Sequence, residues 1–224
     1  ENLIVTGQWV SHPVHGEQVQ AERVERHLPD TEAEIQAYLG SGVVKGVGPA
    51  TAERIVACFG AETLTVLEEV PERLGEVRGI TARKAREIAE SFAYHTGMRR
   101  LMDFLNRNDL PLTLALRLYR RYGVKALEEV KKNPYLLVDE TYGVDFAVMD
   151  AIALGQGLPG DSPRRVDAAV LFELSYNLGN GHVFLPRDKL VDAASRLIDC
   201  PADMVEAALD SLVERGAVCR EQVA

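Results

Sequence analysis

Two short turns that contain glycine, which we call glycine corners, have residue types and spacing that could bind a ligand. In the first, Gly46-Val47-Gly48 follows an apolar stretch and precedes Ala52 and Ile55 at helical spacing. Glycine lets the backbone turn sharply, and the helix that follows begins with N–H groups that have no partner inside the helix. Such N–H groups can bind a phosphate oxygen. The pattern is typical of a helix-hairpin-helix unit, which contacts a nucleic-acid backbone without reading bases.

The second corner, Gly79-Ile80-Thr81, precedes Ala85 and Ile88 and repeats the first pattern with threonine in place of the second glycine. That departure makes it the weaker candidate. Main-chain amides of both corners would bind phosphate, and neighbouring polar and basic side chains would add contacts that weaken with salt. The candidate DNA-binding residues are Lys45, Gly46, Val47, Gly48 and Thr51 in the first unit, and Arg78, Gly79, Ile80, Thr81, Arg83 and Lys84 in the second.

A larger repeat relates residues that lie 63 positions apart. Phe59-Gly60 corresponds to Tyr122-Gly123, and Pro71 corresponds to Pro134. The agreement predicts a duplicated unit of two hairpins. The third corner, at 109–111, has lost both glycines, and the fourth, at 143–145, has lost one. We therefore expect the first pair of hairpins to hold phosphate and the second pair to be mainly architectural.

Side chains that could catalyse a reaction or bind a metal are not grouped. The five histidines show no ligand spacing, and the three cysteines lie far apart, which indicates neither a disulfide framework nor a zinc site and fits a reducing cytosol. The sequence contains no phosphate loop and no dinucleotide fingerprint. A base-excision glycosylase also carries such a hairpin, but no aspartate–lysine pair stands out beyond it. We predict no catalytic residue, no metal and no cofactor in this segment, which should be inactive alone.

Charge is distributed unevenly along the 224 residues, whose net charge is −9. Residues 73–132 hold 14 lysines and arginines against 7 aspartates and glutamates. Such a local excess can attract phosphates although the whole chain is acidic. The composition, 46% apolar and 26% charged, is that of an ordinary globular protein, with no membrane span or signal peptide. We expect a cytoplasmic protein with no membrane partner.

The fold expected is mainly α-helical, with a β-hairpin before the helices and a turn at His15-Gly16. Thr31 and Glu34 form a capping-box pattern at the first helix. Near the end, helices at 163–178, 187–197 and 201–215 with short strands at 182–185 and 217–219 follow the order of a winged-helix domain. We predict four domains: the remnant of an oligonucleotide-binding-like (OB-like) barrel at 1–29, a tandem helix-hairpin-helix unit at 30–96, a degenerate second unit at 97–158 and a winged-helix-like domain at 159–224.

Several short motifs together resemble the N-terminal region of RecD-like ATP-dependent DNA helicases of superfamily 1. They are Gly7-Gln8-Trp9, the run from Tyr38 to Pro49, Asn133-Pro134-Tyr135, the run from Asp150 to Ala153 and the run from Arg165 to Ala169. The resemblance covers nearly the whole chain. It implies a motor that moves 5′ to 3′ on DNA in replication or repair and that uses ATP and Mg²⁺ in domains downstream of this segment. Its implied partners are those motor domains and single-stranded DNA or junctions of single and double strands.

Two other functions remain open on the sequence. One is a protein-interaction scaffold, since helix-hairpin-helix repeats often become packing modules and two of these four have lost glycines. The other is a junction-binding protein of the RuvA type, which also joins a small barrel to tandem hairpins and would be a tetramer. The RuvA-type interpretation explains neither the duplication nor the C-terminal block.

Overall fold

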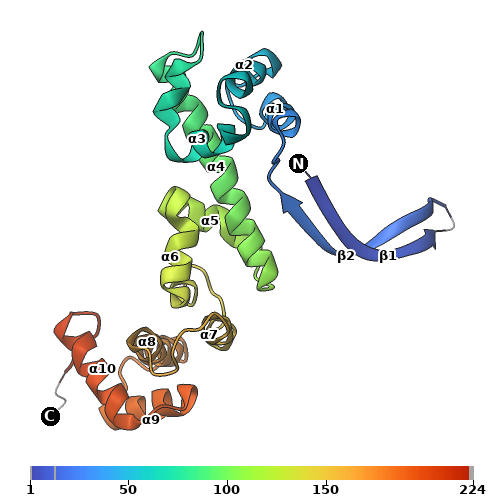
Figure 1. Ribbon diagram of the computed structural model, residues 1–224. Helices are drawn as coiled ribbons and strands as arrows, with labels where there is room; N and C mark the ends of the chain where they lie inside the picture. The colour runs from blue at the N-terminus through green and yellow to red at the C-terminus, as the bar shows by residue number, and fades with distance from the viewer. Residues whose placement is uncertain (1, 13, 222–224) are drawn as a thin grey trace. The chain divides into compact units, whose positions relative to one another are not determined.

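The computed structural model describes residues 2–12 and 14–221 and shows one β-hairpin followed by helices (Figure 1). The chain divides into two compact units, residues 1–99 and 100–224. The first unit contains β1 (Asn2–His12), β2 (Gly16–His27), α1 (Glu32–Gly40), α2 (Pro49–Phe59), α3 (Thr63–Glu69) and most of α4 (Ala82–Arg107). The second contains the end of α4, then α5 (Thr113–Tyr122), α6 (Ala126–Lys132), α7 (Phe146–Gly155), α8 (Pro163–Gly179), α9 (Arg187–Ile198) and α10 (Ala202–Glu214). Short 3₁₀ turns η1 (Gly60–Glu62), η2 (Pro71–Glu76), η3 (Gly123–Lys125) and η4 (Pro134–Leu137) connect them.

The β-hairpin confirms the predicted strands and their turn. β1 and β2 are antiparallel, with Trp9 opposite Val19, and Gly16 takes a φ of +73° at the turn. The register shifts after Thr6, beside Gly7, where a Cβ would lie 2.1 Å from the carbonyl oxygen of Gln20. No third strand joins this sheet within residues 2–12 and 14–221. The OB-like barrel is therefore not confirmed.

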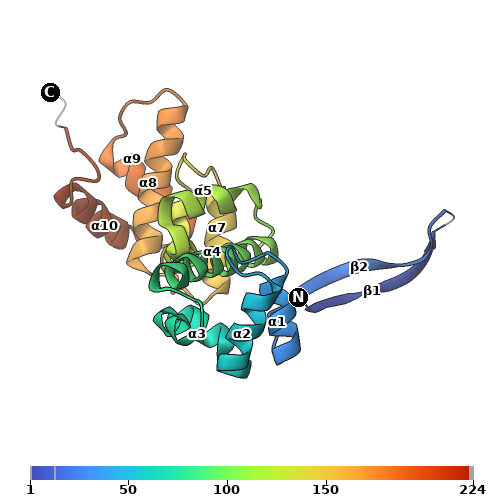
Figure 2. The same ribbon diagram turned by 90° about the horizontal axis from the view of Figure 1, so that it is seen from above.

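The helices of the first unit enclose one apolar core. Thr31 begins α1 as predicted, because its Oγ1 accepts a hydrogen bond from the amide of Glu34 at 3.4 Å. α1 and α2 pack side by side (Figures 1 and 2). Fully buried side chains from α1 to α4 fill the space between the helices, among them Leu39, Ile55, Leu67, Leu74, Ile88 and Phe92. Burying apolar side chains at this spacing stabilises the hairpins that connect the helices.

The duplication is present in the backbone. α2, η1 and α3 are followed by a 3₁₀ turn at Pro71, and α5, η3 and α6 are followed by one at Pro134, again 63 positions on. The glycines that end α2 and α5 have nearly the same dihedral angles, φ 56° and ψ −137° at Gly60 and φ 57° and ψ −139° at Gly123. Both conformations are open to glycine and strained for other residues, which explains why the repeat keeps this residue.

In the second unit, three helices form the last block. α8, α9 and α10 pack on one another and confirm the three predicted helices, with every end within one residue of its predicted place. The two strands predicted beside them are wrong, since residues 182–185 and 217–219 form neither a strand nor a bridge. Val183 and Phe184 are 82% and 66% exposed, and no described strand lies beside them to pair with. The winged-helix assignment is therefore not confirmed.

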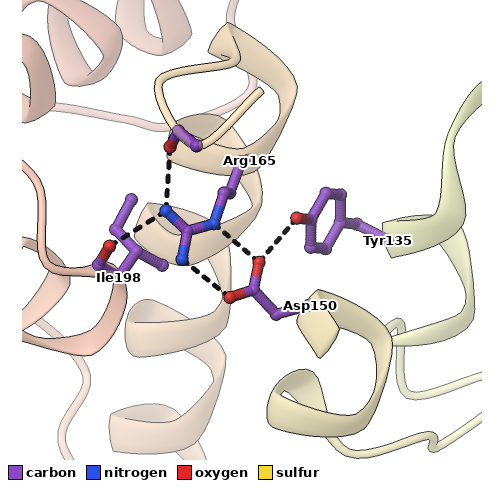
Figure 3. Close-up of polar contacts among 5 residues, drawn as sticks. Tyr135, Asp150, Arg165 and Ile198 are labelled. Atoms are coloured by element: carbon purple, nitrogen blue, oxygen red, sulfur yellow. Dashed lines mark hydrogen bonds and ion pairs between the residues drawn. The ribbon is translucent and has the colours of Figure 1, made fainter. Parts of the chain in front are cut away.

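A buried polar network joins this block to the hairpin before it (Figure 3). The Arg165 guanidinium on α8 donates to both carboxylate oxygens of Asp150 on α7, at 2.7 and 2.8 Å, and to the carbonyl oxygens of Gly160 and Ile198. The Tyr135 hydroxyl donates to the same carboxylate at 2.7 Å. Three motifs that carried the family resemblance thus meet at one point.

None of the described helices is long and apolar enough to cross a membrane.

Candidate nucleic-acid interface

The first hairpin connects α1 to α2 and is anchored by apolar side chains. Val44 and Val47 are 1% and 3% exposed, and the amide of Val47 donates to the carbonyl oxygen of Val44 at 3.2 Å. Between them, Gly46 adopts a φ of +86°, a conformation that disfavours side chains other than glycine. Because the valines point into the core, the two glycines on either side of Val47 lie at the surface.

The amides of Gly46 and Gly48 donate to no acceptor within the described part of the chain. Gly48 is also the N-cap of α2, where it has no side chain to satisfy the first turn, and Pro49 at the next position has no N–H. The amide of Ala50 is the next donor, and it too has no acceptor among the described residues. Partial positive charge therefore collects at the start of α2, at an exposed corner with free donors.

The second hairpin connects η2 to α4 with the same geometry. Gly79 has a φ of +85°, and the amide of Ile80 donates to the carbonyl oxygen of Val77 at 3.0 Å. Thr81 stands where the first hairpin has Gly48, and its Oγ1 accepts a hydrogen bond from the amide of Lys84 at 3.2 Å. The equivalent amide of the first hairpin, that of Thr51, donates to the carbonyl oxygen of Gly48 at 2.9 Å, so this donor is used by the protein itself in both hairpins.

An arginine links the two hairpins. The Nη1 of Arg54, on α2, donates to the carbonyl oxygen of Arg78 at 2.7 Å, while its Nη2 donates to Thr51 Oγ1 at 3.2 Å and its Nε to the carbonyl oxygen of Ala50. A Cβ at Gly79 would lie 2.7 Å from Nη1 of Arg54. The missing side chain at Gly79 thus gives the guanidinium room to reach the second hairpin.

The structure divides the predicted site residues into exposed and buried ones. Exposed in the two hairpins are Lys45, Gly46, Gly48, Arg78, Gly79, Thr81 and Arg83, and Lys84 is half-buried. Val47 and Ile80 are buried, so their side chains hold the turns in place. Thr51 is 8% exposed, and its hydroxyl faces Arg54. Arg83 forms an exposed ion pair with Glu87 at 2.9 Å.

Two residues of the interface were missed by sequence reasoning. Arg54 spans both hairpins, and Ser91 on α4 accepts the amide of Lys45 at 2.8 Å and so fixes the first turn against the last helix of the unit. Arg54 carries a signal in the sequence, because the residue 63 positions later is Arg117. Nothing local marks Ser91, whose partner lies 46 residues away.

The corners of the second pair use their backbone donors internally. In the fourth, the amides of Gly143 and Val144 donate to Asp139 and Leu137, and the Asp145 carboxylate caps α7 by accepting from Ala147. In the third, Asp109 takes the positive φ of +53° that a glycine would favour. A carboxylate at each corner would repel phosphate, which fits the expectation that this pair does not bind through its turns.

The described residues offer no arrangement for metal chemistry, since no group of three or more His, Cys, Asp or Glu side chains in 2–12 and 14–221 could hold an ion. The shifted pKa of Asp150 belongs to a structural pair. Burial raises the pKa of the Asp150 carboxyl, but hydrogen bonds from Arg165 and Tyr135 lower it by more, so the net pKa lies below its ordinary value. The arrangement as a whole supports binding of an anionic ligand at the first hairpin.

Known proteins are similar to this chain over most of its length. Residues 94–184 match the family model of the ATP-dependent RecD2 DNA helicase HHH domain. Over 192 residues, 85% of this chain, the sequence is 29% identical to the ATP-dependent RecD2 DNA helicase of Deinococcus radiodurans. The chain spans 27% of that helicase's length. The resemblance inferred from the motifs is thereby confirmed: the chain matches the N-terminal, helix-hairpin-helix-containing region of RecD-like DNA helicases, a region without the motor domains.

Proposed function

We propose that this chain is a DNA-binding N-terminal segment of a helicase and that it holds the sugar–phosphate backbone at its first hairpin. The observation that supports this most directly is the pair of exposed amides at Gly46 and Gly48, which donate to no acceptor in the described chain. They lie at the start of α2, where the helix dipole favours an anion. Lys45, exposed on the same turn, adds a positive charge.

Binding through main-chain amides and a lysine is independent of base sequence. A phosphate oxygen would accept hydrogen bonds from Gly46, Gly48 and Ala50, replacing the water that solvates these donors in the free protein. Gly79 in the second hairpin would provide a weaker contact, because the side chain of Thr81 stands where the first hairpin has the open Gly48. Each phosphate neutralised releases counterions, so affinity should fall with rising salt.

We extend the proposal to a longer helicase of which this chain would be the N-terminal part. The chain would belong to a 5′–3′ helicase that acts in DNA replication or repair in the cytoplasm and binds single-stranded DNA or single/double-strand junctions. Its motor domains would bind ATP and Mg²⁺, since the residues present here include no phosphate loop. The OB-like assignment of the β-hairpin belongs to the same proposal.

A charge substitution at Gly48 tests the site without disturbing the fold. Gly48 has an extended backbone with φ −95° and ψ 175°, and a Cβ there would meet nothing within 4 Å. Aspartate is a favoured N-cap residue, so Gly48→Asp should fold, while its carboxylate would lie where the phosphate binds. Gly48→Asn is the matched control, because it has the same shape and capping ability without the charge.

DNA affinity is measured by fluorescence anisotropy with a labelled oligothymidylate and a labelled mixed-sequence duplex. We expect Gly48→Asp to weaken binding at least tenfold, a change of about 1.4 kcal/mol, and Gly48→Asn to weaken it much less. Equal affinity of wild type and Gly48→Asp would rule out phosphate binding at this hairpin. Binding of neither probe by the wild type would favour the scaffold function instead.

A further inference from the structure

The duplication allows the surface charge of the two copies to be compared at equivalent positions. Residues 117–132 of the second copy contain six lysines and arginines and two glutamates. Their equivalents, residues 54–69 of the first copy, contain one arginine and three glutamates. The net charge of the same structural segment therefore changes from −2 to +4, although the helices and the turn between them are the same.

The difference is concentrated at exposed positions on α5, η3 and α6. Arg120, Arg121 and Lys125 replace Ala57, Cys58 and Glu62, and all six positions are exposed. At the end of α6, two further lysines replace two glutamates: Lys131 and Lys132 stand where the first copy has Glu68 and Glu69. We call Arg120, Arg121, Lys125, Lys131 and Lys132 the basic face.

The first copy folds without cations at these positions. Of the five residues, Arg121 has a contact within the fold, since its guanidinium lies over the ring of Tyr122, 5.4 Å from its centre. Arg120 and Arg121 lie in the last turn of α5, where positive charge interacts favourably with the helix dipole. However, α2 has no basic residue in its last turn and ends in the same glycine conformation. An architectural role thus leaves the charge of the other four residues unexplained.

The arginine that precedes the basic face has a different use in each copy. Arg54 donates to the backbone of the second hairpin, whereas the guanidinium of Arg117 lies over the ring of Tyr142, 5.5 Å from its centre. In both copies this arginine contacts the hairpin that follows it in the sequence. Because Arg117 stabilises the fold through this contact, we do not include it in the basic face.

We propose that the basic face binds the DNA backbone and that the second copy has replaced amide contacts at its turns with side-chain cations on its helices. The proposal rests on the proposed function in that it names the same ligand, but it uses other residues. Arg120 and Arg121 lie next to each other on the exposed side of α5, and Lys125 follows one turn later, a spacing that suits successive phosphates. The acidic corners at Asp109 and Asp145 favour contact through the helices over contact through the turns.

The test compares two triple variants of the chain with equal loss of charge. The first is Arg120→Ala/Arg121→Ala/Lys125→Ala. The control is Lys189→Ala/Arg196→Ala/Arg220→Ala, which removes three exposed cations from the last block. Far-UV circular dichroism and thermal unfolding verify that both are folded. Affinity for the oligothymidylate and the duplex is then measured over a range of salt concentrations.

We expect the basic-face variant to bind DNA roughly tenfold more weakly and to reduce the slope of log affinity against log salt by roughly 2 to 3, while the control changes neither by as much. Unchanged affinity and slope in the basic-face variant would overturn this inference, and so would equal effects of the two variants. If only Gly48→Asp lowered binding, the hairpin site would stand and the basic face would not. If only the basic-face variant lowered DNA binding, the basic face would stand and the hairpin site would not. Binding of an acidic protein segment to the basic face, with no binding of DNA there, would also contradict the inference.

Discussion

The guanidinium of Arg54 donates a 2.7 Å hydrogen bond to the main-chain carbonyl of Arg78, and this contact fixes the spacing of the two hairpins in the first unit. Arg54 lies in the second turn of the helix that starts at the first hairpin, and Arg78 immediately precedes the glycine of the second. One side chain therefore connects the two corners that carry the candidate phosphate donors. Their relative position is set within the free protein, which would lower the entropy cost of the DNA binding proposed here.

Substitution of Gly79 should expose this relationship. Gly79→Ala strains a backbone with φ +85° and places a Cβ 2.7 Å from Nη1 of Arg54, so the Arg54–Arg78 bond must break or shift. We expect a loss of about 2 kcal/mol in the free energy of unfolding, measured with urea. Gly42→Ala is the control, since Gly42 has a φ of +88° and nothing within 4 Å of its Cβ position.

The contribution of the contact is obtained from a double substitution. In an Arg54→Ala background, Gly79→Ala should cost no more than Gly42→Ala, because only the strain of the positive φ is left in both. A larger cost of Gly79→Ala that persists without Arg54 would show that the guanidinium is not what the glycine accommodates.

The substitution at Gly48 that we expect to weaken DNA binding should also stabilise the protein. Gly48 is an N-cap without a side-chain hydrogen bond, and aspartate both accepts from the first-turn amides and interacts favourably with the helix dipole. We expect Gly48→Asp to raise the free energy of unfolding by a few tenths to about 1 kcal/mol. A variant that is more stable and yet binds less DNA would separate function from folding, whereas a destabilised Gly48→Asp would show that another contact constrains this position.

Threonine caps predict comparable losses at two places in the first unit. Thr31 Oγ1 accepts from Glu34 at the start of α1, and Thr81 Oγ1 accepts from Lys84 at the start of α4. We expect Thr31→Ala and Thr81→Ala each to lower the free energy of unfolding by about 1 kcal/mol. Thr81→Gly should cost only a few tenths, because glycine tolerates the cap conformation, and it should not weaken DNA binding. Thermal unfolding of the three variants checks this ranking.

Local sequence patterns predicted helices better than strands. The starts of α8, α9 and α10 follow from prolines at 163, 186 and 201, since proline fits the beginning of a helix and not its interior. The strands expected at 182–185 and 217–219 rested on short apolar runs that follow Gly181 and Gly216. Such runs form a strand only when another strand lies alongside, and the described residues provide none there.

The site was predictable where it depends on backbone conformation and not where it depends on distant contacts. Gly46 and Gly79 both adopt the positive φ that their place in the pattern indicates. The pairing of Lys45 with Ser91 and of Arg54 with Arg78 joins residues 46 and 24 positions apart, and no local rule connects them. The buried valine and isoleucine of the two corners were identified as part of the site, but their role in the structure is to anchor the turns.

Asp150 should make the stability of the second unit sensitive to acid. Its pKa is lowered in the folded protein, so the carboxylate stabilises the fold above the ordinary carboxyl pKa of about 3.9, and this contribution is lost as pH falls through the lower folded value. Asp150→Asn leaves the buried Arg165 guanidinium without a counter-ion, and we expect a loss of about 3–5 kcal/mol at neutral pH. The difference from wild type should shrink below about pH 4 in urea unfolding measured across pH. Asp150→Leu/Arg165→Met, which removes both charges, should be less destabilised than Asp150→Asn at neutral pH, and a difference that stayed constant down to the lowest pH would show that the ion pair does not carry the effect.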